Sequence, residues 1–302
     1  MKEIRFDGQV AIVTGAGGGL GRDYALALAA LGAKVVVNDL GGSLDGTGPS
    51  SPTAETVATE IIEAGGEAIA NGASVLDEAG FAELVDQVVA KWGRIDMLVA
   101  NAGILRDRSF AKMSVEDFRA VLDVHVMGAV IPIKSVWEIM RGQNYGRIVV
   151  ASSGSGLYGN FGQSNYGAAK LALIGLIKTL KIEGAKNGIR LNAVAPVAAT
   201  RMTEKLVTPE VLAHLSPQHI TPGVLYLLSH GALTGAILAA GAGVMATASI
   251  YETEGHYFGS RPATVEAVRA AWESIGDPEG QQAYKTSDGH SGKFFRRAGI
   301  GI

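Results

Sequence analysis

The stretch Thr14-Gly15-Ala16-Gly17-Gly18-Gly19-Leu20-Gly21 follows a short apolar run and opens a segment of helical periodicity. Glycines at a strand-to-helix turn let the backbone approach a pyrophosphate closely, and the helix N-terminus offers N–H groups and the positive end of its dipole. An ordinary tight turn also uses glycine, but the place in the first strand-turn-helix unit favours a dinucleotide site. Gly15, Gly19, Leu20 and Gly21 are therefore predicted to contact a cofactor.

Short apolar strands alternate with helical segments on both sides of this turn. Runs such as Val35-Val36-Val37 are apolar throughout, as expected for a parallel sheet covered on both faces. The alternation predicts an α/β protein with a doubly wound parallel sheet, a Rossmann fold. Strands are expected at residues 10–14, 34–38, 67–71, 97–100, 147–151 and 190–195, and helices at 21–31, 54–64, 78–92, within 115–140, and at 166–186.

Two segments depart from this rhythm. Residues 41–52 form a long Gly, Ser and Pro-rich loop, which predicts a functional or mobile segment. Residues 232–248 predict a buried strand and turn that close the domain of residues 1–248. Residues 249–302 are expected to be an extension, first helical over 264–275 and then polar.

The composition narrows the function classes. The net charge is −3 and the basic residues are scattered, so no nucleic acid partner is expected. The chain has no cysteine, which excludes disulfides and thiolate chemistry. It has no apolar h-region at the N-terminus and no apolar run of about 18 residues, so we expect neither a secretory signal nor a membrane span. We expect a cytoplasmic protein without a metal site.

Asp39 ends the second apolar strand. An acidic side chain at this point hydrogen-bonds the adenosine ribose hydroxyls and repels a 2′-phosphate. No Arg follows at 38–42 to bind that phosphate, so the sequence favours NAD over NADP. The alternative is that Asp39 only caps the loop that follows.

Tyr166 and Lys170 stand four positions apart in a predicted helix, so their side chains emerge on one face. On most helices such a pair lies at the surface without chemistry. Here it follows a dinucleotide-binding half, and Ser153 lies near the end of a preceding strand. The hydroxyl of Ser153, the phenol of Tyr166 and the ammonium of Lys170 together suit proton transfer.

Together these residues resemble the short-chain dehydrogenase/reductase family over residues 7–248. The matching elements, in the family's order, are Thr14-Gly15-x-x-x-Gly19-x-Gly21, Asn101-Ala102-Gly103, Ser153 and Tyr166-x-x-x-Lys170. Residues 35–42, 101–110, 158–163 and 201–203 are similar to one branch of it. That branch holds the (3R)-hydroxyacyl-CoA dehydrogenase domain of peroxisomal multifunctional enzyme type 2 and bacterial relatives that act on steroids.

The resemblance implies hydride transfer between a secondary alcohol and a nicotinamide. Tyr166 would exchange the hydroxyl proton, Ser153 would bind the substrate oxygen, and Lys170 would hold the nicotinamide ribose. The charges of Lys170 and the nicotinamide are expected to lower the pKa of Tyr166 toward working pH. Further cofactor contacts are expected from Ser74, Val75, Asn101, Ala102, Gly103, Pro196, Val197 and Thr200. An apolar substrate lining is expected from Leu157, Tyr158, Phe161, Met202 and Leu206, which are otherwise ordinary core or interface residues.

Three positions differ from the family's pattern. His125 stands where the family has an Asn that holds a water beside the catalytic lysine; it is expected to relay protons or to pack. Ser74-Val75 replaces an adenine-binding Asp-Val pair, which is expected to weaken one side-chain contact and to leave the backbone contact in place. Pro196-Val197 replaces Pro-Gly, so the turn at the nicotinamide amide is expected to differ.

The prediction is an NAD-dependent dehydrogenase of a 3-hydroxyacyl-CoA or a hydroxysteroid of the 17β type. The runner-up is a 3-oxoacyl-carrier-protein reductase that uses NADPH, and a non-catalytic NAD-responsive binding protein is the alternative from another class. Small residues, Gly167, Ala168, Ala169, Ala172 and Gly175, line the helix of Tyr166. In the family this helix packs on its symmetry mate, so a homodimer or homotetramer is expected, unless the small residues serve packing within one subunit.

Overall fold

The computed structural model describes residues 3–43, 45–46, 52–198 and 214–300. The chain divides into two compact units, Met1–Thr247 and Ala248–Ile302, where the sequence suggests a boundary after residue 248. The first unit carries the sheet and the candidate site.

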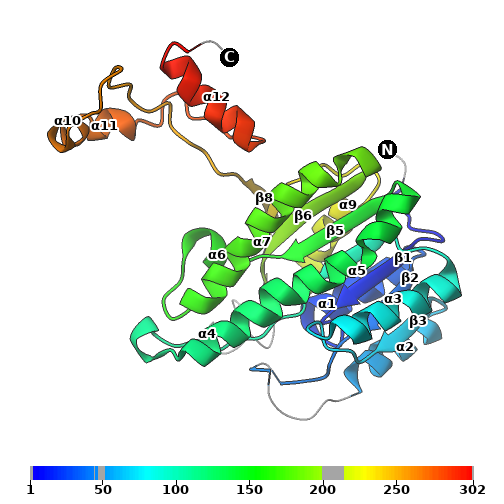
Figure 1. The fold of residues 1–302 in the computed structure, drawn as a ribbon. Coiled ribbons are helices and arrows are strands. Elements are labelled where there is room, and N and C mark those ends of the chain that lie inside the picture. The colour runs from blue at the N-terminus through cyan, green and yellow to red at the C-terminus, as the bar shows by residue number, and fades with distance from the viewer. Residues whose placement is uncertain (1–2, 44, 47–51, 199–213, 301–302) are drawn as a thin grey trace. The chain divides into compact units, whose positions relative to one another are not determined.

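The first unit is built on one sheet with the strand order β3-β2-β1-β4-β5-β6-β7-β8. All pairs from β3 to β7 are parallel. The doubly wound α/β fold predicted from the alternation is confirmed (Figure 1). The strands are β1 (Val10–Thr14), β2 (Lys34–Asn38), β3 (Glu67–Asn71), β4 (Met97–Ala100), β5 (Gly146–Ala151), β6 (Ile189–Val197), β7 (Ile237–Gly241) and β8 (Val244–Ala248).

Helices cover both faces of the sheet because the strands are apolar on both sides. On one face α1, α2 and α9 pack together and on the strands, and on the other face α3, α5 and α7 do so (Figure 1). The helices of the first unit are α1 (Gly19–Ala30), α2 (Thr53–Glu63), α3 (Glu78–Trp92), α4 (Val115–Leu122), α5 (Gly128–Gln143), α6 (Gly154–Tyr158), α7 (Ser164–Glu183) and α9 (Thr221–Leu228).

The order of the strands reverses between β1 and β4, which are neighbours in the sheet although β2 and β3 separate them in sequence. Ligands of such sheets bind outside the carboxyl ends of the strands at this reversal point. The segments that follow β1, β4 and β5 therefore meet at one edge.

The helix predicted within residues 115–140 is interrupted. A π-helical turn, Asp123–Met127, separates α4 from α5, and the Gly128 N–H donates to the Asp123 carbonyl five residues back. Such turns widen a helix locally and are frequent at functional sites. His125 lies in this turn and is 2% exposed.

Residues Val115–Gln143 are long and apolar enough, by length and composition alone, to cross a bilayer. In the structure α5 packs against α3, β4 and β5, and seven of its residues are buried. The apolar character of this segment is therefore accounted for by the core of the first unit.

The end of the sheet differs from the prediction of a buried strand and turn. β7 is partly buried, but β8 is exposed along most of its length. Ala242 and Gly243, both at positive φ, form the two-residue turn between them, as hairpin turns require. The edge strand thus lies outside the core.

In the second unit the helix predicted at 264–275 is split into α10 (Val265–Ala270) and α11 (Trp272–Ile275). The stretch expected to be polar ends in a further helix, α12 (Ser287–Arg297), which begins at the capping hydroxyl of Thr286. Lys293 of α12 is buried and pairs with Glu252. That ion pair ties the helix to the bridge between Glu252 and Gln282.

Candidate active site

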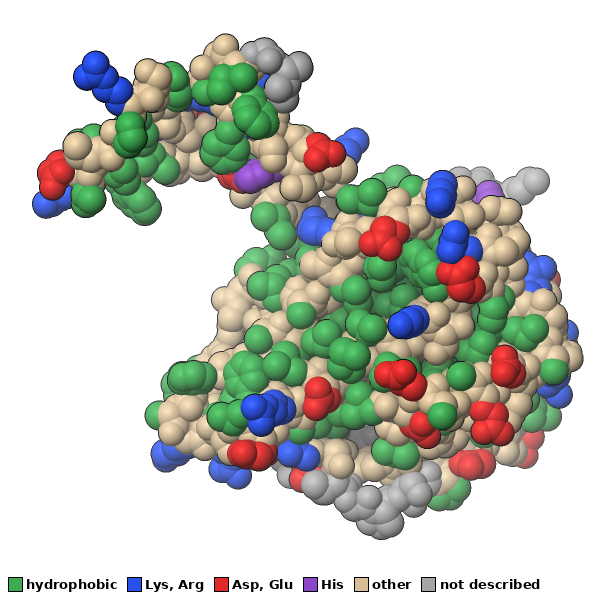
Figure 2. Space-filling model, viewed as in Figure 1, with side chains coloured by type: hydrophobic (Ala, Val, Ile, Leu, Met, Phe, Trp, Pro, Cys, Tyr) green, Lys and Arg blue, Asp and Glu red, His purple; other side chains and the backbone are tan. Residues whose placement is uncertain are grey.

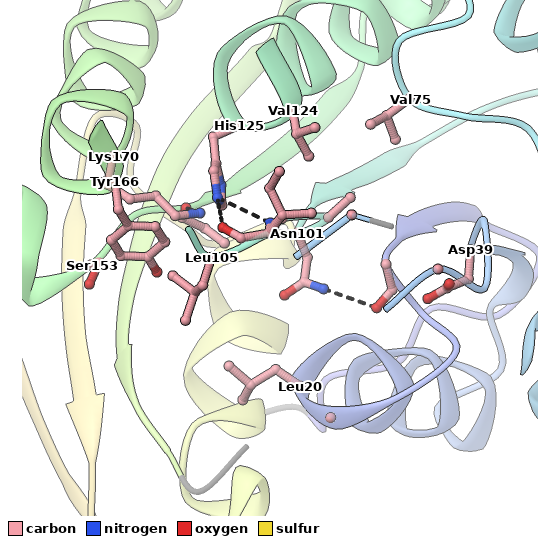
Figure 3. Close-up of a pocket in the computed structure, with 18 of the residues that line it drawn as sticks. Leu20, Asp39, Val75, Asn101, Leu105, Val124, His125, Ser153, Tyr166 and Lys170 are labelled. Atoms are coloured by element: carbon pink, nitrogen blue, oxygen red, sulfur yellow. Dashed lines mark hydrogen bonds between the residues drawn. The ribbon is translucent and has the colours of Figure 1, made fainter. Parts of the chain in front are cut away.

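A cavity of about 720 Å³ opens at the carboxyl ends of the central strands. Its walls come from the turn after β1, the ends of β2, β4, β5 and β6, the π-helical turn and α7 (Figure 3). The predicted site residues that line it are Gly15, Gly19, Leu20, Asp39, Ser74, Val75, Asn101, Ala102, Gly103, His125, Ser153, Tyr166, Lys170 and Pro196.

The glycine-rich turn is held close to β4. Gly15 has a φ of 63°, and a Cβ there would lie 2.8 Å from the Cα of Ala102. Gly21 does not line the cavity; a Cβ at Gly21 would collide with the carbonyl oxygen of Gly15. Gly15 thus serves the approach of the backbone, whereas Gly21 serves the packing of the turn on α1.

Thr14 and Asn101 join the ends of β1 and β4. The Thr14 hydroxyl accepts the backbone N–H groups of Asn101 and Ala102 at 3.0 and 3.1 Å. The Asn101 side-chain amide donates to the Thr14 and Gly15 carbonyls (Figure 3). Thr14 was not assigned a role from the sequence, although its place at a strand end in the glycine motif was a usable signal.

The Asp39 carboxylate faces the glycine-rich turn and accepts backbone N–H groups from Gly17 at 2.8 Å and Gly41 at 2.7 Å. The bond to Gly41 is the loop cap that the sequence left as an alternative. Each carboxylate oxygen has a further lone pair, so capping and ribose binding are compatible at Asp39. The side chain lines the cavity, as a ribose contact requires.

The remaining cofactor positions divide between the wall and the surface. Val75 is 8% exposed and lies over Gly128, where a Cβ would come within 2.7 Å of it. Pro196 lines the cavity, while Val197 is 57% exposed and still belongs to β6. Thr200 lies outside the described residues.

Ser153, Tyr166 and Lys170 come together at the end of β5 and on the first turns of α7 (Figure 3). The side chain of Ser153 hydrogen-bonds Tyr166. The Lys170 ammonium lies 5.5 Å from the centre of the Tyr166 ring and donates to the Ala151 carbonyl at 2.5 Å. The three side chains therefore form one proton-handling group.

The structure distinguishes the two adjacent serines. The hydroxyl of Ser152 is buried and donates to the Lys170 carbonyl at 2.9 Å, so it fastens β5 to α7. Ser153 is the N-cap of α6, where its hydroxyl accepts the Ser155 N–H at 3.2 Å. Its hydroxyl remains accessible to the cavity.

The direction of the Tyr166 pKa differs from the prediction. Burial raises the pKa of Tyr166, the hydrogen bond from Ser153 opposes this, and the Asp107 charge adds to it. The protein's own groups therefore favour the neutral phenol, because the desolvation of a phenolate outweighs the stabilisation by Ser153. A positive nicotinamide would have to contribute the opposing charge.

Lys170 is 3% exposed. Burial lowers its pKa to about 7, because a charged ammonium is disfavoured away from water. Near neutral pH this side chain can therefore hold or release a proton.

His125 packs edge-on against the Tyr166 ring, with 5.1 Å between the ring centres. Its Nε2 lies 2.8 Å from the Ile104 carbonyl oxygen and 3.3 Å from the Ile104 backbone nitrogen (Figure 3). We assign the proton to Nε2, because the shorter contact is with an acceptor. Burial and the charge of Lys170 hold the pKa of His125 well below its usual value. The ring is thus neutral, and its Nδ1 is without a hydrogen-bond partner among the described residues.

Of the predicted apolar substrate residues, the three that the structure describes, Leu157, Tyr158 and Phe161, do not line this cavity. Leu157 borders a neighbouring groove, and Tyr158 and Phe161 are 79% and 89% exposed. Met202 and Leu206 lie outside the described residues. The described polar wall beside Ser153 comes instead from Ser155, Asn160 and Gln163, which the sequence reading did not select.

The residues present fit a nicotinamide dinucleotide. A turn that close packing restricts to glycine opens at the N-terminus of α1, as a pyrophosphate site needs. Asp39, which the sequence predicts to bind the ribose, lines one end of the cavity, and Ser153, Tyr166 and Lys170 line the opposite end (Figure 3). One end of the cavity, beside Asp39, thus suits an adenosine, and the other end, beside Ser153, Tyr166 and Lys170, suits the reacting groups.

The family model for short chain dehydrogenases matches residues 9–210. The chain belongs to the short-chain dehydrogenase family. It is 49% identical over 273 residues to a putative short-chain type dehydrogenase/reductase, Rv0148, of Mycobacterium tuberculosis. The alignment covers 90% of this chain and 95% of that protein. Its fold binds a nicotinamide cofactor.

Two solved structures resemble this short-chain dehydrogenase. Full-length peroxisomal multifunctional enzyme type 2 from Drosophila melanogaster aligns with a TM-score of 0.82 and 37% identity, over 97% of this chain and 50% of that chain. This chain thus spans about half of the Drosophila protein. A 7α-hydroxysteroid dehydrogenase complexed with NADH and 7-oxo glycochenodeoxycholic acid aligns with a TM-score of 0.71 and 30% identity, over 79% of this chain and 95% of that chain.

Replacing Gly103 with alanine tests the packing of His125. A Cβ at Gly103 would collide with the His125 ring. Because that ring abuts Tyr166, we expect kcat/KM of Gly103→Ala to fall roughly 10- to 100-fold. Gly142→Ala in α5 is the matched control, since a Cβ there meets no atom within 4 Å. Equal rates for both variants would contradict this role of Gly103.

The buried ammonium of Lys170 makes stability depend on pH. Its folded pKa of about 7 lies below the usual 10.5, so between these values the unfolded chain binds more protons. The free energy of unfolding contributed by this group therefore rises with pH in that window. Urea denaturation at several pH values should show the free energy of unfolding of the parent rising relative to that of Lys170→Met as the pH increases from about 7 to 10.5, by at most about 1.4 kcal/mol per pH unit. A pH-independent difference would contradict the buried-lysine assignment.

Proposed function

We propose that the chain is an NAD-dependent dehydrogenase of a secondary alcohol carried by a 3-hydroxyacyl-CoA or a hydroxysteroid. The observation that carries this proposal is the grouping of Ser153, Tyr166 and Lys170 at the far end of the cavity from Asp39, with the Lys170 ammonium 5.5 Å from the centre of the Tyr166 ring.

The reaction divides the work among these side chains. A bound nicotinamide supplies the hydride acceptor at its C4 atom. Tyr166 would take the proton of the substrate hydroxyl while the carbinol carbon would give up its hydride to the bound nicotinamide, so that alcohol and NAD⁺ would become ketone, NADH and a proton. Ser153 holds the substrate oxygen and stabilises the charge that develops on it. Lys170 holds the ribose, and its ammonium form acts against the burial that raises the pKa of Tyr166.

Oxidation is expected to be favoured as the pH rises. Burial raises the pKa of Tyr166, so a higher pH is needed before its phenolate forms and accepts the substrate proton. In the reverse direction the neutral phenol is already the proton donor. Ketone reduction should therefore run at lower pH than alcohol oxidation.

Asp39 supports NAD over NADP. Its carboxylate lines the cavity, and its oxygens keep lone pairs for ribose hydroxyls. A 2′-phosphate would place negative charge against it. An NADPH-dependent 3-oxoacyl-carrier-protein reductase is the second enzyme candidate, and this carboxylate disfavours it.

One relative supports a substrate class by name. The 7α-hydroxysteroid dehydrogenase is named for a hydroxyl carried by a steroid. A non-catalytic NAD-responsive binding protein is the alternative from another class, and the hydrogen-bonded catalytic group argues against it.

His125 is proposed to hold the segment after β4 and the Tyr166 ring in position. A neutral ring that donates to Ile104 fixes the segment after β4 and supports the edge of Tyr166. A proton relay through His125 would have to use its Nδ1 lone pair, because the low pKa disfavours an imidazolium.

A homodimer or homotetramer is proposed for the assembly, in the cytoplasm. The face over α5 and α7 carries many apolar side chains (Figure 2). On α7, Ala168, Leu171, Ala172 and Gly175 are exposed. Small exposed side chains would let a second copy of α7 approach closely.

The test of the catalytic assignment is Tyr166→Phe with NAD⁺ and a 3-hydroxyacyl-CoA or a 17β-hydroxysteroid, followed by NADH absorbance. We expect kcat to fall by about 10²- to 10⁴-fold, because the substrate proton has no acceptor. NADH binding, measured by fluorescence, should persist. Tyr226→Phe, at a half-exposed tyrosine of α9, is the control. Undiminished turnover of Tyr166→Phe would favour the non-catalytic alternative.

Asp39→Asn tests the cofactor assignment. The variant keeps the shape of the side chain but removes the charge that repels a 2′-phosphate. The ratio of kcat/KM with NAD⁺ to that with NADP⁺ should fall by about 10- to 100-fold, as expected for loss of a charged hydrogen bond. Asp86→Asn, exposed on α3, should leave the ratio unchanged. A parent enzyme that prefers NADP⁺ would overturn the assignment.

A further inference from the structure

Gln163 is a buried polar side chain that the catalytic steps above do not use. It is 8% exposed and is the last residue before α7, the helix that carries Tyr166. The polar atoms of a buried amide need hydrogen-bond partners, and both the oxygen and the nitrogen of the Gln163 amide have them. Its environment therefore reveals which atoms it presents to a ligand.

The partners fix the orientation of the amide. Its Nε2 donates to the Asp107 carboxylate at 2.7 Å, and a carboxylate only accepts. Its Oε1 accepts from the Ser155 hydroxyl at 2.7 Å and from the Asn160 amide at 3.0 Å. The second N–H of Gln163 is the donor that remains.

This network stands directly beside the reacting end. The Ser155 N–H donates to the hydroxyl of Ser153, which in turn bonds Tyr166. Ser155, Asn160 and Gln163 line the catalytic cavity and also a neighbouring groove of about 390 Å³ between α6 and α7. A ligand held at Ser153 and leading toward the groove passes these polar groups.

The remaining N–H of Gln163 can bind a hydrogen-bond acceptor of the substrate, such as a carbonyl oxygen. In a 3-hydroxyacyl thioester one methylene separates the carbinol carbon from the thioester carbonyl. A steroid of the 17β type carries no carbonyl at that place. The groove beyond is lined by Gly156, Gly159, Gly167 and Ala168, among others, which leaves room for an extended chain.

We propose that Gln163, oriented by Asp107, binds the thioester carbonyl of the substrate and so selects 3-hydroxyacyl thioesters. This inference rests on the proposed dehydrogenase function and narrows its substrate. Gln163 thereby determines specificity, while Asp107 acts through it as a positioning residue.

The experiment compares a 3-hydroxyacyl thioester with the matching thioether, which lacks only the carbonyl oxygen, with NAD⁺. The parent should prefer the thioester by at least about tenfold in kcat/KM, as one hydrogen bond at a buried donor allows. In Gln163→Met, which keeps length and loses the donor, this preference should fall to within about threefold, chiefly through the KM of the thioester. Rates with the thioether should change little.

Two further variants control the result. Gln87→Met, at an exposed glutamine of α3, should leave the preference unchanged. Asp107→Asn, at an exposed site, frees the orientation of the amide and should reduce the preference in part. It also keeps the proposal testable if Gln163→Met fails to fold.

The outcomes separate this proposal from the dehydrogenase function. If Gln163→Met and Asp107→Asn leave the preference intact, or lower both substrates equally, the role of Gln163 is overturned while the dehydrogenase function stands. If the parent oxidises a hydroxysteroid but no thioester, the thioester assignment is likewise overturned and the steroid form of the function stands. Absence of all turnover would overturn both.

Discussion

The hydrogen bonds between Thr14 and Asn101 hold together the two strand ends on which the site depends. β1 and β4 are adjacent in the sheet, and at their carboxyl ends the Thr14 hydroxyl accepts two N–H groups from the segment after β4. The Asn101 side-chain amide in turn donates hydrogen bonds to the carbonyls at the end of β1 and in the turn that follows. These bonds fix the glycine-rich turn against Ala102, and a nucleotide site needs that close backbone geometry.

The reacting end depends on burial. Lys170 and His125 are removed from water, and Tyr166 is largely so. Desolvation disfavours the charged form of each, so it raises the pKa of the phenol and lowers those of the two bases. Near pH 7 Tyr166 and His125 are therefore neutral, whereas Lys170, with a pKa of about 7, is divided between its charged and neutral forms.

Much of this architecture was predictable. The bounds of the first four strands follow from short apolar runs between turn residues, and β1, β2, β3 and β4 were predicted as they occur. The glycine turn, Asp39 and the Tyr166–Lys170 pair are local patterns, and the structure brings them to one cavity. The helix predicted within 115–140 is present as α5, preceded by α4, but the turn between them was not predicted, because a π-helical turn leaves no periodic signature.

The sequence by itself determined the order of strands and helices, the cofactor half and the proton-transfer group, because each is written in neighbouring residues. Tertiary structure alone decided what depends on distant contacts. It bonded Ser152 to the Lys170 carbonyl, left Tyr158 and Phe161 exposed, and joined Gln163 to Asp107. It also set the direction of the Tyr166 pKa, since burial is a property of the packed molecule.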